Sequence, residues 1–308
     1  MTKRKAKKIE VRTETACCTG SGNHGEDSGR SGDEIRARVS RDYAEALRRA
    51  RTAEGGGCCS PAARVEPAGS AAKLAGYGEE LAAHPEAGAS SFGCGNPLAF
   101  ADVRSGEWVL DLGSGAGLDI LIAAEKVGPA GRVIGVDMTA AMVEAARANA
   151  RRAGLSQVEV RQGVIEDLPV ADSSVDWVIS NCVVNLSPEK ERVFAEIHRV
   201  LKPGGRFSIS DLVVEDLPAS LREQAIVHSA CIGGAISAAE YVAGLESAGL
   251  ADVRVSERIE YDIAAIRGLV ESDLVGSPAD ARALEAGLAA FRGSVASVRL
   301  SGRRPGGP

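Results

Sequence analysis

Three cysteines that are far apart in the sequence stand beside glycines or at the expected ends of strands. Cys94 lies in the motif GCGNP, Cys182 in SNCVVNLSP and Cys231 in ACIGGA. A single cysteine is most often a small buried hydrophobic residue. Here, however, each cysteine is expected in a loop or at an element end, and glycines beside two of them permit close approach of a ligand. The three are therefore candidate substrate-binding residues.

The chain has four further cysteines. Cys58 and Cys59 are adjacent in a loop that begins with three glycines. Cys17 and Cys18 lie in the N-terminal tail, and we assign this pair no role. No Cys-x-x-Cys occurs, which argues against an ordinary zinc finger or a thioredoxin-type redox pair. In a reducing cytosol the cysteines are expected to be mostly thiols rather than structural disulfides.

A glycine-rich segment, DLGSGAG at residues 111–117, follows a short apolar run and precedes a helical pattern. Glycines at such a turn let the backbone bend sharply and approach a ligand. Residue 118 is Leu, so the dinucleotide pattern Gly-x-Gly-x-x-Gly is not met, and a phosphate-loop Lys followed by Ser or Thr is missing. This loop favours a nucleoside cofactor.

Two more expected strand ends carry groups that suit a nucleoside. Asp137 ends a strand, where its carboxylate can accept hydrogen bonds from both ribose hydroxyls. Beyond the next strand, residues 163–169 bring acidic and apolar groups to a place where an adenine ring can lie. The candidate cofactor residues are Asp111, Gly113, Ser114, Gly115, Asp137, Met138, Ile165, Glu166 and Asn181.

Strands alternate with helices from residue 107 onward, which predicts a parallel, doubly wound α/β sheet. The predicted strands are 108–112, 132–136, 157–162, 175–180 and 206–211, with two more at one edge, 253–259 and 295–300. The predicted helices are 33–51, 79–83, 118–127, 140–153 and 188–200, the last stopping near Lys202-Pro203-Gly204-Gly205.

Composition limits the class of protein. The chain has 308 residues, 44% of them hydrophobic, and a net charge of −6. This charge gives no footprint for nucleic acid, and no apolar run approaches the roughly 18 residues that span a bilayer. The basic N-terminus is followed by no apolar stretch, so we expect a cytoplasmic protein. We expect four segments: a disordered tail (1–33), a helix with cysteine-bearing loops covering the active site (34–100), a cofactor-binding core (101–215), and a region with one substrate cysteine and edge strands (216–308).

Residues 90–215 resemble the class I S-adenosylmethionine methyltransferases, in which VLDLGSGAG, VIGVD and RVLKPGGR are typical. The resemblance implies a seven-stranded Rossmann-like sheet, with Asp137 as ribose ligand. From about Tyr43 to Tyr241 the chain is more specifically similar to the arsenite S-adenosylmethionine methyltransferases, through SNCVVNLSP, GCGNP, GVDMT and ACIGGA. That family carries arsenic on three cysteines, which implies Cys94, Cys182 and Cys231. It also implies a secondary role for Cys58 or Cys59 in metalloid delivery or redox exchange.

The implied reaction fits these residue types. Trivalent arsenic is soft, as thiolates are, and three sulfurs leave its lone pair free to attack a sulfonium methyl group without a general base. Catalysis would then come from positioning the reactants roughly 3–3.5 Å apart. The expected partners are S-adenosyl-L-methionine, trivalent arsenicals and a thiol reductant, glutathione or thioredoxin, as co-substrate. A monomer is expected, without nucleic acid or membrane, acting in detoxification. The alternatives are a methyltransferase of a small organic acceptor and a non-catalytic metalloid-binding protein.

Overall fold

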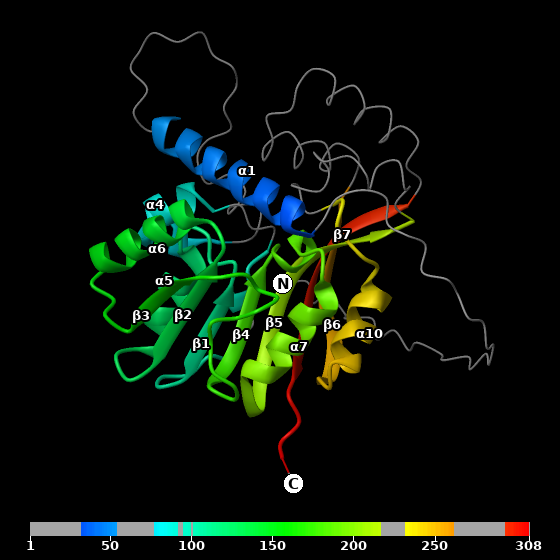
Figure 1. Cartoon of the computed structure of the whole chain (residues 1–308). Helices are drawn as coiled ribbons and strands as arrows, with labels where there is room; N and C mark the ends of the chain where they lie inside the picture. Colours follow the sequence, from blue (N-terminus) through cyan, green and yellow to red (C-terminus); the bar gives the residue numbers. More distant parts are fainter. Residues whose placement is uncertain are drawn as a thin grey trace, which may run out of the picture. The chain divides into compact units, whose positions relative to one another are not determined.

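The computed structural model describes residues 32–53, 77–91, 95–99, 101–216, 232–261 and 293–307, all within one compact unit. Their core is a seven-stranded sheet in the order β3-β2-β1-β4-β5-β7-β6 (Figure 1). The strands are β1 (Trp108–Leu112), β2 (Arg132–Asp137), β3 (Val158–Gln162), β4 (Val175–Asn181), β5 (Leu201–Glu215), β6 (Ala251–Tyr261) and β7 (Ser294–Arg303). Every neighbouring pair from β3 to β5 is parallel, and β7 runs antiparallel to both β5 and β6. The predicted doubly wound α/β class is confirmed.

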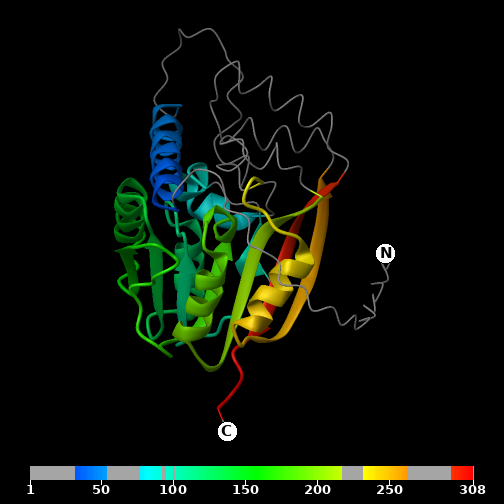
Figure 2. The same ribbon diagram turned by 45° about the vertical axis from the view of Figure 1, so that its right-hand side comes forward.

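Helices cover both faces of the sheet, because the central strands are apolar on both sides. One face is covered by α5 (Leu118–Val127) and α6 (Ala140–Arg152), whose apolar residues pack on Val109 and Val133. The other is covered by α7 (Lys190–Val200) and α10 (Ala238–Ser247), which lie side by side in Figure 2. This double cover leaves the strand ends as the natural place for a ligand.

Shorter elements lie before β1 and after β4. Helix α1 (Gly32–Ala53) lies against α6, and α3 (Glu79–Ala83) and α4 (Pro85–Ala89) follow it in the described sequence. Two 3-10 turns, η1 (Pro97–Ala99) and η2 (Val184–Leu186), flank the sheet. Among the described residues, no helix is long and apolar enough to cross a bilayer.

The start of β5 differs from the prediction. The sequence predicts a strand from Arg206, after a turn at Lys202-Pro203-Gly204-Gly205, but β5 begins at Leu201. Leu201 pairs with Val175, and a register shift between Val175 and Trp177 absorbs the extra residues as a bulge. The helix therefore gives way to the strand without a separate loop. The two predicted edge strands do form at one end of the sheet, with the later one, β7, on the inside.

Candidate active site

A cavity opens at the carboxyl ends of the parallel strands, beside the loops that follow β1, β2, β3 and β4. It contains about 940 Å³ of space, partly open to solvent. Cys182 lines it together with eight of the nine predicted cofactor residues: Gly113, Ser114, Gly115, Asp137, Met138, Ile165, Glu166 and Asn181. The ninth, Asp111, is 2% exposed within β1 and is not among the lining residues. The fold thus brings residues from four separate loops to one place.

The glycine loop after β1 adopts a backbone that side chains disfavour. Gly113, Gly115 and Gly117 all have positive φ, at 66°, 51° and 101°. A Cβ on Gly113 would lie 2.4 Å from the side chain of Val183, so this residue permits close packing against the loop after β4. A Cβ on Gly115 would meet nothing within 4 Å. Gly115 therefore keeps the cavity wall open.

Asp137 joins the end of β2 to the glycine loop. Its Oδ2 accepts a hydrogen bond from the backbone N–H of Gly115 at 2.9 Å, and its Oδ1 accepts one from that of Thr139 at 2.8 Å. Burial raises the pKa of Asp137, while these two backbone donors act in the opposite direction. A carboxylate has about four acceptor positions, so this one retains capacity for hydroxyl donors from a ligand.

Two more carboxylates are buried close by. Asp111 is buried in β1, and its pKa is raised well above the ordinary range, first by burial and then by the charges of Asp119 and Asp137. Asp119, in the first turn of α5, lines the cavity, and burial raises its pKa to about 6. Three buried acids without a cation among their described hydrogen-bond partners favour a positively charged ligand.

Helix α1 contributes to the cavity wall, which the sequence did not assign by residue. Arg36, Val39 and Tyr43 line the cavity. Arg36 Nη1 lies 3.1 Å from Glu166 Oε1 and 2.9 Å from Glu189 Oε2. The carboxylate of Glu166, expected beside adenine, is thus paired with Arg36 and also accepts a 2.6 Å hydrogen bond from Ser187 Oγ. No local pattern in α1 indicates these pairings, because the partners are more than 100 residues away.

Asn181 ends β4 and connects three segments through its amide. Its Oδ1 accepts the backbone N–H of Gly95 at 3.1 Å, and its Nδ2 donates to the Gly95 carbonyl. The same Nδ2 lies 2.9 Å from the Tyr77 hydroxyl and 3.3 Å from Asp119 Oδ2. Asn181 lines the cavity, but its polar atoms are used within the protein.

Cys182 follows Asn181 in an unusual backbone conformation. Its φ is 57°, a region that costs a non-glycine residue about 1 kcal/mol. Its N–H donates to the Ser210 carbonyl at 2.8 Å, and the residue is 4% exposed. The cysteine is disulfide-bonded, so the expectation of a free thiol is wrong for Cys182.

The remaining predicted cysteines, Cys94, Cys231, Cys58 and Cys59, lie outside the described residues. Their described neighbours are informative for two of them. Gly95, which follows Cys94, is bonded to Asn181 as above, and a Cβ on it would lie 2.6 Å from Ser210. Ile232, which follows Cys231, is buried.

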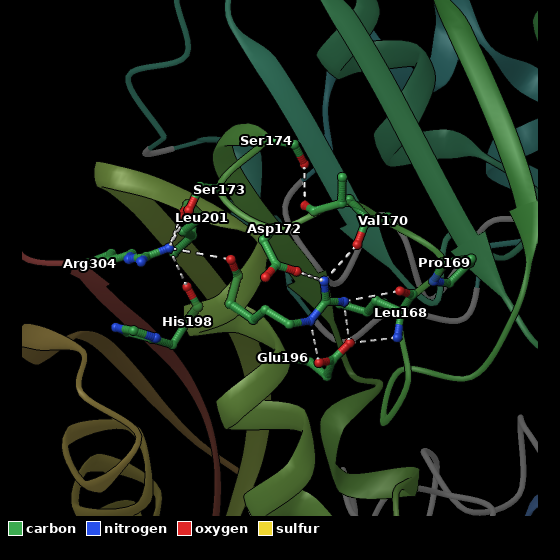
Figure 3. Close-up of polar contacts among 12 residues, drawn as sticks. Leu168, Pro169, Val170, Asp172, Ser173, Ser174, Glu196, His198, Leu201 and Arg304 are labelled. Carbon is green, nitrogen blue, oxygen red and sulfur yellow. Dashed lines mark hydrogen bonds and ion pairs between the residues drawn. The ribbon is translucent and has the colours of Figure 1, made fainter.

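The loop that carries Ile165 and Glu166 is anchored at its far end by Arg199 of α7. Figure 3 shows the partners Leu168, Val170 and Glu196 of this contact. The guanidinium donates to the carbonyls of Leu168 and Val170, at 3.1 and 2.8 Å, and pairs with Glu196 at 2.6 Å. Glu196 in turn accepts the Leu168 N–H at 2.7 Å. The loop is therefore held through one backbone N–H, bound by Glu196, and two backbone carbonyls, bound by Arg199. These contacts position the end of the loop that lines the cavity.

Comparison with known proteins places the chain in a family. Residues 104–258 match the family described as "Methyltransferase domain". "Arsenite methyltransferase" of Halobacterium salinarum is 47% identical over 207 residues, which are 67% of this chain and 52% of that protein. "Arsenite methyltransferase" of Homo sapiens is 35% identical over 213 residues, 66% of this chain and 54% of that protein. The chain thus spans about half the length of these curated relatives.

A solved structure agrees with these relatives. The crystal structure of CrArsM, "an arsenic (III) S-adenosylmethionine methyltransferase from Chlamydomonas reinhardtii", is 34% identical, with a TM-score of 0.58. It covers 78% of this chain, and this chain covers 75% of it. The glycine loop, the strand order and these relatives lead to one assignment. The chain belongs to the class I S-adenosylmethionine-dependent methyltransferases, in the family of the arsenite methyltransferases.

Proposed function

We propose that this protein transfers a methyl group from S-adenosyl-L-methionine to trivalent arsenic, as arsenite or methylarsenite, held by cysteine thiolates. The observation that carries the proposal is the place of Cys182, which lines the same cavity as Gly113, Gly115 and Asp137. A soft sulfur ligand and a nucleoside-type site thus share one space. The left-handed backbone of Cys182 is a local strain of the kind that persists where function requires it.

The residues of the cavity fit this cofactor. Asp137 offers acceptor capacity for ribose hydroxyls, and buried Ser114 Oγ has no hydrogen-bond partner in the described structure. Asp119 lines the cavity, and a bound ammonium or sulfonium group would favour its ionised form against the cost of burial. When bound, S-adenosylmethionine supplies an electrophilic methyl group. The protein's task is to hold that methyl group and the arsenic lone pair in line, roughly 3–3.5 Å apart.

Several contacts support a shared thiolate site that includes Cys94, Cys182 and Cys231. Cys182 is disulfide-bonded, so its sulfur is one that can share a site with another cysteine. Gly95, next to Cys94, is hydrogen-bonded to Asn181, next to Cys182. Soft thiolates suit arsenic, and we assign to Cys58 or Cys59 a secondary role in delivering it.

The disulfide also gives the thiol reductant a role. Cys182 binds arsenic only as a thiolate, so the bond must first be reduced. We propose that two equivalents of a small thiol such as glutathione, or one thioredoxin dithiol, reduce the disulfide and leave as the oxidised disulfide. From this requirement we infer a reaction in the cytoplasm, where such thiols are abundant, and a role of the methylation in detoxification.

The deciding experiment follows S-adenosylhomocysteine formation with arsenite and glutathione, comparing wild type with Cys182→Ser, Cys231→Ser and Cys17→Ser. We expect arsenite-dependent turnover in wild type and in Cys17→Ser, and background turnover in the other two. Wild-type rates in both Cys182→Ser and Cys231→Ser would refute the thiolate site. Arsenite binding without cofactor consumption would indicate a metalloid-binding protein, and thiol-insensitive turnover of an organic acceptor would indicate the other alternative. Cys94→Ser is expected to matter less for methylarsenite, which needs two sulfurs.

A further inference from the structure

Tyr77 is a buried tyrosine whose hydroxyl joins two parts of the site. The residue is 3% exposed and packs in the apolar cluster beneath α5. Its hydroxyl donates to Asp119 Oδ1 at 2.6 Å and accepts from Asn181 Nδ2 at 2.9 Å. A buried hydroxyl used at both ends fixes its two partners relative to each other.

The first partner, Asp119, faces the cofactor side. It lines the cavity and stands in the first turn of α5, directly after the glycine loop. The positive end of the helix and the hydrogen bonds from Tyr77 and Asn181 favour its charged form, whereas burial opposes it. A cation in the cavity would shift this balance toward the carboxylate. Hydrogen bonds to an ionised acceptor are shorter and stronger than neutral ones.

The second partner, Asn181, faces the cysteine side. It precedes Cys182, and its amide holds both the N–H and the carbonyl of Gly95, the residue after Cys94. Gly95 packs closely against β5, because a Cβ on it would lie 2.6 Å from the side chain of Ser210. The position of Asn181 therefore sets the spacing of the backbones beside these two cysteines.

We propose that Tyr77 is a positioning residue that couples cofactor binding to arsenite binding, which makes the two ligands positively cooperative. A bound cation favours ionised Asp119, which strengthens its bond to Tyr77. Tyr77 then holds Asn181, and Asn181 fixes the backbones beside Cys94 and Cys182. Such coupling is reciprocal, so arsenite must tighten cofactor binding by the same factor. The inference rests on the proposed function, since it takes arsenite as the ligand of these cysteines.

The test measures arsenite binding to pre-reduced protein under anaerobic conditions, by equilibrium dialysis with elemental detection of arsenic. Each protein is measured alone and with saturating S-adenosylhomocysteine, which keeps the ammonium group and cannot react. We expect the wild-type Kd for arsenite to fall at least about fivefold with S-adenosylhomocysteine. In Tyr77→Phe the two Kd values should agree within twofold.

Two further variants sharpen the result. Tyr261→Phe makes the same change on β6, where the hydroxyl bonds to Ser297, and it should keep the full coupling. Asp119→Asn keeps the size of the side chain and removes its charge, and should lose the coupling even if Tyr77→Phe does not fold. Equal wild-type Kd values, or full coupling in a folded Tyr77→Phe, would overturn the inference.

The same samples separate this inference from the proposed function. A wild type that methylates arsenite but shows no coupling refutes the role of Tyr77 alone. A wild type that forms no S-adenosylhomocysteine with arsenite refutes both. A merely structural role for Tyr77 would lower the melting temperature of Tyr77→Phe and leave the ratio of Kd values unchanged, which again rejects the inference.

Discussion

The backbone N–H of Gly115 lies 2.9 Å from Oδ2 of Asp137 and so ties the glycine loop to the end of the neighbouring strand. The bond spans 22 residues of sequence and crosses from β1 to β2. It orients the carboxylate along one wall of the cavity while the glycine, which has no side chain, leaves the adjacent space open.

Replacing Gly115 with Ala should weaken cofactor binding more than it weakens the fold. The new Cβ meets no protein atom but occupies cavity space, so we expect the Kd for S-adenosylhomocysteine to rise about tenfold, equal to about 1.4 kcal/mol. Backbone strain at positive φ should add about 1 kcal/mol of destabilisation. Gly154→Ala is the matched control, with φ 68° and open space at the end of α6. It should show the same destabilisation with unchanged affinity in isothermal titration calorimetry. Equal affinity in both variants would argue against a ligand beside Gly115.

Cofactor affinity should fall as the pH is lowered, because Asp119 becomes protonated. Its pKa in the free protein is about 6, and a bound cation favours the ionised form. Protonation below pH 6 therefore competes with binding, and we expect the Kd for S-adenosylhomocysteine to rise by up to about tenfold from pH 7 to pH 5. Calorimetry in buffers of different ionisation enthalpy should detect proton release on binding near pH 6. In Asp119→Asn the pH dependence should be shallower, and a wild-type Kd that is equal at pH 5 and pH 7 would exclude this role.

Arg199→Lys should loosen the loop that carries Ile165 and Glu166. A lysine cannot reproduce the forked pairing with Glu196 and the two carbonyl contacts at once, so we expect a loss of about 2 kcal/mol in unfolding free energy. Cofactor affinity should fall as well, because the loop whose other end lines the cavity loses its anchor. Arg192→Lys, on the exposed side of the same helix, should leave the melting temperature unchanged. An unchanged cofactor Kd in Arg199→Lys would show that the loop is held elsewhere.

Arg36→Ala should speed cofactor release. Arg36 is the residue of α1 that bonds both Glu166 and Glu189, so its loss frees the helix from the loop after β3 and from the start of α7. We expect the dissociation rate of S-adenosylhomocysteine to rise about tenfold in stopped-flow displacement, with a smaller change in association. Arg48→Ala, exposed on the same helix, should behave as wild type. Unchanged release from Arg36→Ala would mean that α1 does not retain the ligand.

Local patterns predicted the strand and helix boundaries around the glycine loop. The predicted β1 and α5 match the structure in both bounds, because a short apolar run, a glycine turn and an amphipathic run follow one another without interruption. Eight of the nine expected cofactor residues line the cavity, because the carboxyl ends of parallel strands meet at one edge of the sheet. Helix α10 went unpredicted although its capping box, Ser237 with Glu240, is a local signal.

The contributions of Tyr77 and Arg36 could not be predicted in this way. Tyr77 meets Asp119 across 42 residues, and Arg36 meets Glu166 across 130. Neither residue belongs to a recurring local pattern, and each acquires its role from packing between distant segments. Spacing rules describe neighbours along one element, so such pairs become visible in three dimensions.

The position of β7 has a consequence for how the chain folds as it is synthesised. Residues 294–303 lie between β5 and β6, although β6 is made more than 30 residues earlier. Until β7 leaves the ribosome, β5 and β6 each keep an unpaired edge, and the nascent chain exposes backbone that is prone to pair with other molecules. Completion of the sheet is therefore a late, long-range event, of the kind that slows folding and leaves a newly made chain exposed to aggregation.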